Sequence, residues 1–383
     1  PSGDWDLATH ARPEEVRRIF RRTVPLGVEH GTVGVLSDDG VMYEVTTFRR
    51  DVETDGRHAV VCFADTVDED LGRRDFTMNA VAWHPLRNEV RDPFDGLGDL
   101  ERGVLRAVGV ASERFAEDYL RILRAFRFAG RFQVVIEEAT WTAACAAVEH
   151  LTTLSAERIR EELLKILDAD RVPSVALELY RRSGAFRVLY PELQAVASRD
   201  PGIWAALLRA VDHLPPGRPL LRLAALLRGL PPRDAAQILT RMKLSNAQVD
   251  EVARRAAAPP LPDAGASGAD VRRWLSAVGR ERVSAVARLE LARARTGGAV
   301  SPETVVAAWR GCRKVLAQAP PLEVRDLAVD GRDLIRMGLR PGPRFGTLLE
   351  ELLAWVLDDP ARNEPELLLA RARRLAGDED PHV

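Results

Sequence analysis

The chain contains little cysteine and no long apolar run. Only three of its 383 residues are cysteines, at positions 62, 145 and 312, and they form no C-x-x-C pair. This excludes a zinc ribbon and a disulfide framework, and it is typical of a reducing compartment. The most apolar stretch, residues 220–230, is interrupted by two arginines. It is therefore no transmembrane helix, which needs about 18 apolar residues. We expect a cytoplasmic protein with no membrane partner.

Lysine is also scarce, and neither sign of charge predominates. Lys and Arg number 55 and Asp and Glu 57, which gives a net charge of −2. This balance excludes a protein that is basic throughout, although a local basic face remains open. Only three of the 55 basic residues are lysines. The planar guanidinium of arginine suits phosphates and base edges, but a GC-rich coding sequence would produce the same arginine excess.

The first hundred residues have the pattern of a small α/β unit. Short β-rich runs occur at residues 32–36, 41–48 and 59–63, and a Ser-Asp-Asp-Gly turn at 37–40 predicts a hairpin between the first two. Residues 13–20 predict a short amphipathic helix with acidic residues in its first turn.

From about residue 113 the apolar residues recur at intervals of three and four, which predicts a long all-helical region. A Pro-rich stretch at 259–265 predicts a linker within it. The expected helices are 113–130, 138–149, 155–168, 172–182, 202–213, 218–229, 232–241, 246–256, 268–279, 281–295, 302–317, 330–337, 344–358 and 364–376.

Three carboxylates in the first part of the chain could hold metal ions. Asp4 and Asp6 are separated by one residue, so in a strand both point to the same face. Two such carboxylates are favourable together when hard cations such as Mg²⁺ bridge them, as in phosphoryl transfer. Glu44, in a predicted neighbouring strand, could add a third carboxylate. A chance D-x-D pair and a solvent-facing glutamate are the alternatives.

Two later stretches combine arginine with aspartate. In Arg-Arg-Asp-Phe-Thr-Met-Asn-Ala (residues 73–80), two arginines beside Asp75 could bind a triphosphate and a ribose, or form a surface salt-bridge cluster at a helix start. In the predicted helix around 117–127, Asp118, Arg121 and Arg124 fall on one flank, and Arg127 falls on the opposite flank. Asp118 and Arg121 could each face a nucleobase edge, or they could form an i,i+3 salt bridge.

Together these stretches resemble the bacterial class II tRNA nucleotidyltransferase and poly(A) polymerase family. The family's motifs occur in its order: Asp-Trp-Asp-Leu-Ala-Thr at 4–9, Glu-Val-Thr-Thr-Phe-Arg at 44–49, the octapeptide at 73–80, and Glu-Asp-x-x-Arg-x-x-Arg at 117–124. A fifth, helical motif occupies 155–163. The octapeptide is highly specific and the D-x-D is not. Residues 330–343 also look like the family's C-terminal region.

The chain departs from the family pattern in two respects. The Gly-Gly-x-Val-Arg-Asp strand and turn that precede the D-x-D in the family are not in this chain, and we expect that its first strand has been truncated or left out. Some relatives carry a phosphohydrolase module marked by a His-Asp doublet. This chain has no His-Asp dipeptide, so we expect no such activity.

The resemblance implies an α/β nucleotidyltransferase head followed by an elongated all-α neck, body and tail. We place the catalytic head at residues 1–112 and the neck, which recognises the nucleotide base, at 113–173. The helical body would cover 174–265, and the tail, with tRNA-binding helices, 266–383.

The resemblance also implies roles for the head residues. Asp4 and Asp6 would be catalytic and would hold two Mg²⁺ ions, and Glu44 would be the third catalytic carboxylate. Arg74 would bind the triphosphate or the sugar of the nucleotide. Asp75 could accept a hydrogen bond from the ribose 2′-hydroxyl and so favour NTP over dNTP.

In the neck, Asp118 and Arg121 resemble the pair that reads the incoming base without a nucleic-acid template. Cytosine and adenine each offer an amino donor to the carboxylate and ring acceptors to the guanidinium. Uracil would leave polar groups unpaired, which discriminates strongly. Arg124 and Arg127 match further nucleotide-binding positions of the family.

The implied reaction is the addition of CCA to the 3′ end of tRNA from CTP and ATP, by a protein that we expect to be a monomer. Enzymes adding only CC or only A are close alternatives. Residues 51–58 match the flexible loop linked to the switch from C to A, which favours the full reaction. A poly(A) polymerase and a non-catalytic RNA-binding relic are less favoured.

Overall fold

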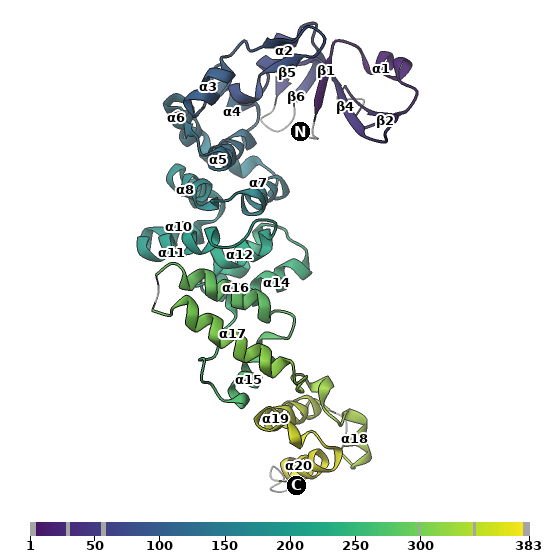
Figure 1. Ribbon diagram of the computed structural model, residues 1–383, viewed down its shortest axis with the longest axis vertical. Helices are drawn as coiled ribbons and strands as arrows, with labels where there is room; N and C mark the ends of the chain where they lie inside the picture. Colours follow the sequence, from purple (N-terminus) through teal and green to yellow (C-terminus); the bar gives the residue numbers. More distant parts are fainter. Residues whose placement is uncertain (1–4, 28–30, 55–58, 298, 340–341, 378–383) are drawn as a thin grey trace. The chain divides into compact units, whose positions relative to one another are not determined.

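The computed structural model describes residues 5–27, 31–54, 59–297, 299–339 and 342–377. The chain divides into two compact units, coloured along the sequence in Figure 1. Unit 1 comprises residues 1–201 together with 240–243, and unit 2 comprises 202–239 and 244–383. The predicted α/β head followed by an all-helical region is confirmed.

The head begins with a four-stranded sheet in the order β1-β4-β3-β2. Strand β1 runs parallel to β4, whereas β3 is antiparallel to both β4 and β2. The β3–β4 hairpin is the one that the sequence predicts, and Gly40 in its turn has a φ of +84°, a conformation that glycine adopts readily. The four strands are β1 Asp6–Thr9, β2 Thr23–Pro25, β3 Thr32–Leu36 and β4 Met42–Thr47.

One face of this sheet is covered by helix α1 (Pro13–Ile19), which lies beside the sheet in Figure 1. Val16 of α1 packs with Val33, Val35 and Val45 in a small buried cluster. Because side chains alternate along β4, the buried position of Val45 places Glu44 on the opposite, exposed face. The sheet therefore presents one apolar face to α1 and leaves the other free for chemistry.

The second half of the head connects this sheet to the helical region through short elements. They are β5 Arg49–Thr54, β6 Ala59–Phe63, α2 Val67–Gly72, η2 Thr77–Asn79, β7 Ala82–His84, β8 Glu89–Arg91, α3 Gly96–Arg102 and β9 Val104–Leu105. Thr66 caps α2 in a reciprocal capping box with Glu69. This cap fixes the start of the helix that leads into the arginine-rich octapeptide.

The remaining helices of unit 1 pack around α5, whose buried face includes Ile122, Phe126 and Ala129. Helices α7 and α8 both contact α5. The helix predicted over 113–130 is wrong as a single element, because two helices with a break at residues 118–119 occupy this stretch. The elements are α4 Ala111–Glu117, α5 Leu120–Phe132, β10 Val135–Ile136, α6 Glu138–Ala147, η3 Val148–Thr153, α7 Ala156–Ala169, α8 Pro173–Ser183, α9 Ala185–Leu189 and α10 Pro191–Arg199.

A four-residue segment from much later in the chain, 240–243, completes unit 1. Arg241 donates to both carboxylate oxygens of Glu192, at 2.9 and 2.7 Å, and to the carbonyl of Leu189. Arg160 donates in turn to the carbonyls of Met242 and Lys243. These contacts join α7 and α10 to a segment that the chain reaches only after passing through part of unit 2.

Unit 2 is entirely helical within the described residues and has two buried clusters, one around Trp274 and Leu275 and one around Leu334 and Leu352. The Pro-rich stretch at 259–265 separates α14 from α15 as predicted. The helices are α11 Pro201–Asp212, α12 Pro219–Leu227, α13 Pro232–Arg241, α14 Asn246–Ala257, α15 Gly268–Val278, α16 Val283–Ala294, α17 Pro302–Leu316, η4 Val324–Asp326, α18 Gly331–Arg336, α19 Arg344–Asp358, η5 Pro360–Arg362 and α20 Pro365–Gly377. In the part of the chain that the structure describes, no helix combines the length and apolarity that a membrane crossing requires.

Candidate active site

Two of the three predicted carboxylates lie side by side on the free face of the sheet. Asp6 of β1 and Glu44 of β4 are partners in the parallel register, and both side chains are exposed. Asp4 lies outside the described residues. Among those residues, no group of three or more His, Cys, Asp or Glu side chains is arranged to hold a metal ion. Two neighbouring carboxylates are nevertheless the oxygen donors that a hard cation prefers.

A buried aspartate that the sequence analysis did not identify organises the octapeptide arginines. Asp70, in α2, is 2% exposed. It accepts a hydrogen bond from Arg73 at 3.1 Å and lies 3.6 Å from the guanidinium of Arg74. It also accepts from the backbone of Arg49, the first residue of β5. The carboxylate therefore links the start of β5 to both arginines, at the end of a helix and not at the helix start considered from the sequence.

Arg74 keeps hydrogen-bonding capacity for an anion. Its Nε atom is buried, and no described residue accepts a hydrogen bond from it. The side chain as a whole is 33% exposed, so part of the guanidinium reaches the surface. A buried donor without an acceptor is unfavourable, and a phosphate oxygen would satisfy it.

Asp75 and Arg124 form the next contact between the octapeptide and the helical region. The Asp75 carboxylate accepts from Arg124 Nε at 2.7 Å. Its other oxygen accepts from the side chain of Asn79 at 3.0 Å and from the backbone of Phe76 at 2.9 Å. Asp75 is 8% exposed, so this carboxylate orients Arg124 from within the protein. A hydrogen bond from Asp75 to a ribose remains a prediction.

Arg121 and Arg114 extend this network along the same edge of the octapeptide. Arg121 donates to the carbonyl of Arg73 at 3.2 Å, and Arg114 donates to the carbonyl of Gly72 at 2.8 Å. Glu117 accepts from both guanidiniums, at 2.5 and 2.7 Å. The backbone that carries Arg73 and Arg74 is thus held by charged side chains of α4 and α5.

Asp118 is not on the helix with Arg121, so the predicted common flank of Asp118, Arg121 and Arg124 is wrong. Asp118 ends α4 in an extended conformation, with φ −157° and ψ 104°. Its Oδ1 accepts from the backbone of Leu120 at 3.1 Å, a local bond that competes with helix continuation. Its Oδ2 accepts from Arg158 of α7 at 2.7 Å, which replaces the i,i+3 pair with Arg121 considered from the sequence.

Arg127 lies on the buried side of α5, as its predicted opposite flank requires. It is 7% exposed and donates to Glu162 of α7 at 2.6 Å. The helix runs on past Gly130 to Phe132, so it does not end where Arg127 could have turned to the other flank. The geometry gives Arg127 a packing role between two helices, and its contact with a nucleotide remains a prediction.

Two further residues of the fifth motif join this arrangement. Arg158 and Glu162 are one turn apart on α7, and they pair with Asp118 and Arg127 respectively. Their i,i+4 spacing on a predicted helix was visible in the sequence, but their partners lie 40 and 35 residues away. The structure therefore shows that the fourth and fifth motifs form one set of contacts.

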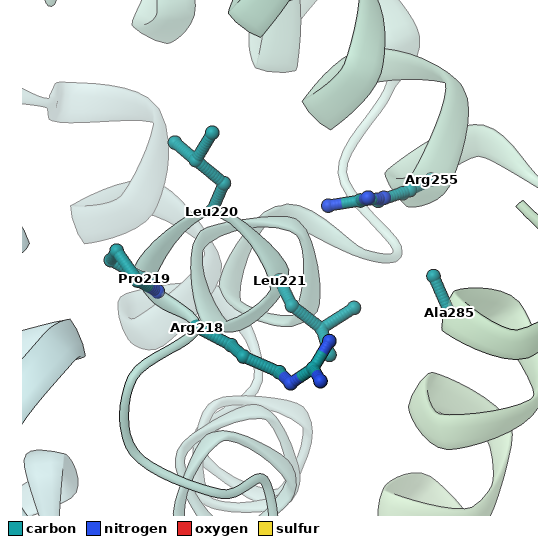
Figure 2. Close-up of a pocket in the computed structure, with 6 residues that line it drawn as sticks. All are labelled: Arg218, Pro219, Leu220, Leu221, Arg255 and Ala285. Atoms are coloured by element: carbon teal, nitrogen blue, oxygen red, sulfur yellow. The ribbon is translucent and has the colours of Figure 1, made fainter.

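Unit 2 contains a separate basic cavity of about 270 Å³. Arg218 and Leu221 border it at the start of α12, Arg255 reaches it from α14 and Ala285 from α16 (Figure 2). Arg255 is paired with Glu251, and its carbonyl accepts a hydrogen bond from Arg228. The opening is lined by two guanidiniums and apolar side chains, which suits a phosphate or another small anion.

Comparisons with known proteins agree along the whole chain. Family models match residues 1–106 as a Poly A polymerase head domain, 134–196 as an RNA and SrmB binding site of polymerase A, and 221–372 as tRNA nucleotidyltransferase domain 2. The CCA-adding enzyme of Lactobacillus delbrueckii subsp. bulgaricus is 35% identical over 367 residues, which is 95% of this chain and 87% of that protein. That of Geobacillus kaustophilus is 35% identical over 96% of this chain and 87% of its own length.

Solved structures give the same result. The Bacillus stearothermophilus CCA-adding enzyme in complex with CTP matches with a TM-score of 0.77 and 31% identity, over 99% of this chain and 91% of that one. The Thermotoga maritima CCA-adding enzyme complexed with tRNA-CCA matches with a TM-score of 0.53 and 23% identity, over 94% of this chain and 83% of that one. At that identity the second likeness concerns the fold alone.

Proposed function

Because the chain belongs to the CCA-adding enzyme family of tRNA nucleotidyltransferases, we propose that it adds C, C and A to the 3′ end of tRNA. CTP and ATP are the substrates and pyrophosphate is released. The observation that carries the proposal is a set of contacts at the octapeptide: Asp70 pairs with Arg73 and Arg74, Arg124 pairs with Asp75, and Arg121 donates to the carbonyl of Arg73. These residues belong to one compact unit with the Asp6–Glu44 pair, which supports the proposal that they bind the nucleotide together. We expect the enzyme to act as a cytoplasmic monomer.

The donor set on β1 and β4 fits Mg²⁺. Asp6 and Glu44 offer exposed carboxylate oxygens on one face, and Asp4 is separated from Asp6 by a single residue. These three residues would hold the metal. When bound, divalent cations would lower the pKa of the attacking hydroxyl and neutralise the charge on the leaving pyrophosphate. The chain itself contributes the strand pairing that keeps Asp6 beside Glu44.

Arg74 binds the triphosphate in this proposal. The exposed part of its guanidinium is available to phosphate oxygens. Asp70 holds Arg73 and lies close to Arg74, so neither long side chain must be ordered entirely by the nucleotide. This preorganisation lowers the entropic cost of binding.

Asp118 and Arg121 read the base from two different elements. Asp118 uses one lone pair of each carboxylate oxygen for Arg158 and Leu120, and a carboxylate has about four such sites. It can therefore accept from the amino group of cytosine or adenine without losing Arg158. Arg121 donates to the carbonyls of Arg73 and Arg114 and to Glu117, and in this proposal its guanidinium turns to the ring acceptors of the base when the nucleotide binds. Uracil would place a carbonyl against Asp118, which leaves both groups unpaired.

The test compares Asp6→Asn and Glu44→Gln with wild type on tRNA that lacks its three terminal nucleotides. Loss of about 3 kcal/mol of transition-state stabilisation corresponds to a loss of roughly 10²-fold in turnover. Binding of tRNA should persist in both variants. Asp38→Asn, on the exposed β3–β4 turn, is the matched control and should keep wild-type activity. Wild-type turnover in Asp6→Asn would overturn the catalytic assignment.

The same assay separates the three related reactions. A full CCA-adding enzyme extends the shortened tRNA with CTP and then with ATP, and it also adds A to tRNA that lacks only that nucleotide. A CC-adding enzyme stops after two additions. An A-adding enzyme extends only the tRNA that lacks its terminal A, and it uses only ATP.

A further inference from the structure

Tyr119 and His150 form a parallel ring stack beside the proposed base-reading residue. Their ring centroids are 4.6 Å apart and their planes differ by 9°. Tyr119 follows Asp118 directly and starts α5 with φ −61° and ψ −17°. His150 lies in η3, the short helix before α7, and its side chain is exposed. The stack therefore joins the α4–α5 break to the segment that leads into α7.

A second contact joins the same two segments. Asp118 pairs with Arg158 of α7 at 2.7 Å, and Ser155 caps α7 by accepting from the backbone of Arg158. Residues 118 and 119 are consecutive, so the ion pair with α7 and the ring stack with η3 both fix the same short stretch of backbone. A stretch held at two points has less freedom to rotate than one held at a single point.

The position of the histidine is itself fixed. Val148 and Leu151, on either side of it in η3, are 3% and 0% exposed. Glu149 forms an ion pair with Arg187 of α9. His150 thus projects from an anchored helical turn, and its ring offers a rigid surface to Tyr119.

We propose that the Tyr119–His150 stack positions Asp118 for base selection. This inference rests on the proposed base-reading role of Asp118. In this proposal both rings act as positioning residues, through the backbone of the α4–α5 break. With the stack intact, the carboxylate stays where cytosine and adenine can donate to it. Without the stack, Asp118 is held by Arg158 and local bonds alone, so its carboxylate can adapt to a wrong base.

The experiment measures kcat and KM for CTP and UTP separately, on tRNA that lacks its three terminal nucleotides. His150→Ala and Tyr119→Ala should reduce the preference for CTP between about twofold and tenfold, the range that an aromatic pair contributes. His150→Phe and Tyr119→Phe keep two stacked rings and should restore the preference. Thr152→Ala, an exposed change in the same η3, is the control and should leave the preference unchanged.

Asp118→Ala separates the two proposals. If it reduces the preference while His150→Ala and Tyr119→Ala leave it at the wild-type value, the stack has no positioning role and the inference is overturned. If Asp118→Ala also leaves the preference unchanged, the base-reading role and the inference fail together. Reduced preference in all three alanine variants, with rescue by phenylalanine, supports the inference.

Discussion

Arg127 donates from Nε to Glu162 Oε2 across 2.6 Å, and the two side chains are only 8% and 2% exposed. The pair joins α5 to α7. Burial raises the pKa of the neighbouring Tyr180 hydroxyl well above its ordinary value, and the nearby negative charge of Glu162 raises it further. The ion pair therefore lies in the interior of unit 1. Its removal should lower the free energy of unfolding before it changes activity.

Removing one partner of this pair should destabilise the protein strongly. Arg127→Met leaves the Glu162 carboxylate buried without its guanidinium partner and with the ion pair to Lys165, and we expect a loss of about 3–5 kcal/mol in the free energy of unfolding. Urea unfolding at pH 7 measures this loss. The double variant Arg127→Met with Glu162→Leu removes the unpaired charge and should recover much of it. A changed preference between CTP and UTP in folded Arg127→Met would instead indicate that Arg127 contacts the nucleotide.

Gly130 should not tolerate a methyl group. A Cβ atom at this position would lie 2.7 Å from the Cβ of Ala176 in α8 and 3.0 Å from its backbone nitrogen. We expect Gly130→Ala to cost about 1–3 kcal/mol, as overpacking does, although alanine favours helices.

The matched control for this change is Gly311→Ala. Gly311 lies within α17, and no atom is within 4 Å of its added Cβ. There the helix propensity of alanine should stabilise the protein by up to about 1 kcal/mol. Thermal unfolding of both variants checks the pair of predictions, and equal changes in both would contradict the packing argument.

Asp99 should make the stability of the head sensitive to acid. Burial raises the pKa of this carboxyl, but hydrogen bonds from Arg102, Thr77 and Arg106 outweigh burial and hold the pKa below its ordinary 3.8. A carboxyl with a lowered pKa stabilises the fold at neutral pH, and this contribution is lost as pH falls through the folded-state value.

Asp99→Asn should therefore be less stable than wild type at pH 7, and the difference should shrink once pH falls below about 4. Urea unfolding at a series of pH values measures it. Asp38→Asn, at an exposed turn position, is the control and should follow wild type throughout. A difference between Asp99→Asn and wild type that grows in acid would contradict the argument.

Binding of tRNA should weaken as salt rises and should depend on the arginines of unit 2. Each phosphate contact that is lost should reduce the slope of log affinity against log salt by about 0.7–0.9. We expect Arg218→Ala and Arg255→Ala, at the cavity in Figure 2, to reduce this slope. Arg87→Ala, in the head, is the control. Binding that is insensitive to salt, or a footprint confined to the head, would refute the prediction.

Regular elements were predictable where local pattern determines them. Strands β3 and β4 are short β-rich runs on either side of a turn sequence, so their hairpin followed from the sequence. The break at Asp118 did not follow, because a helical wheel assumes an uninterrupted helix. A hydrogen bond from the backbone N–H of Leu120 to the Asp118 carboxylate accompanies the break, and such bonds leave no periodic signal.

The sequence motifs of the site were predictable, but which of their residues contact one another was not. The motifs indicated which segments would gather, and unit 1 contains all of them. They did not indicate that Asp75 would face Arg124, 49 residues away, or that Asp118 would face Arg158. Such pairing depends on how helices pack in three dimensions, and no single sequence encodes it as local spacing. The buried Asp70 was missed because its charge resembles that of any acid in a first helical turn.

The return of residues 240–243 to unit 1 has a consequence for modularity. The chain passes between the two units three times, after residues 201, 239 and 243. A hybrid enzyme joined at residue 201 would inherit Glu192 and Arg160 from one parent and their partners, Arg241 and the carbonyl of Lys243, from the other. Recombination between distant relatives should therefore succeed only when the graft carries both residues 1–201 and residues 240–243. The head and neck are then inherited together with this short segment of the following helical region.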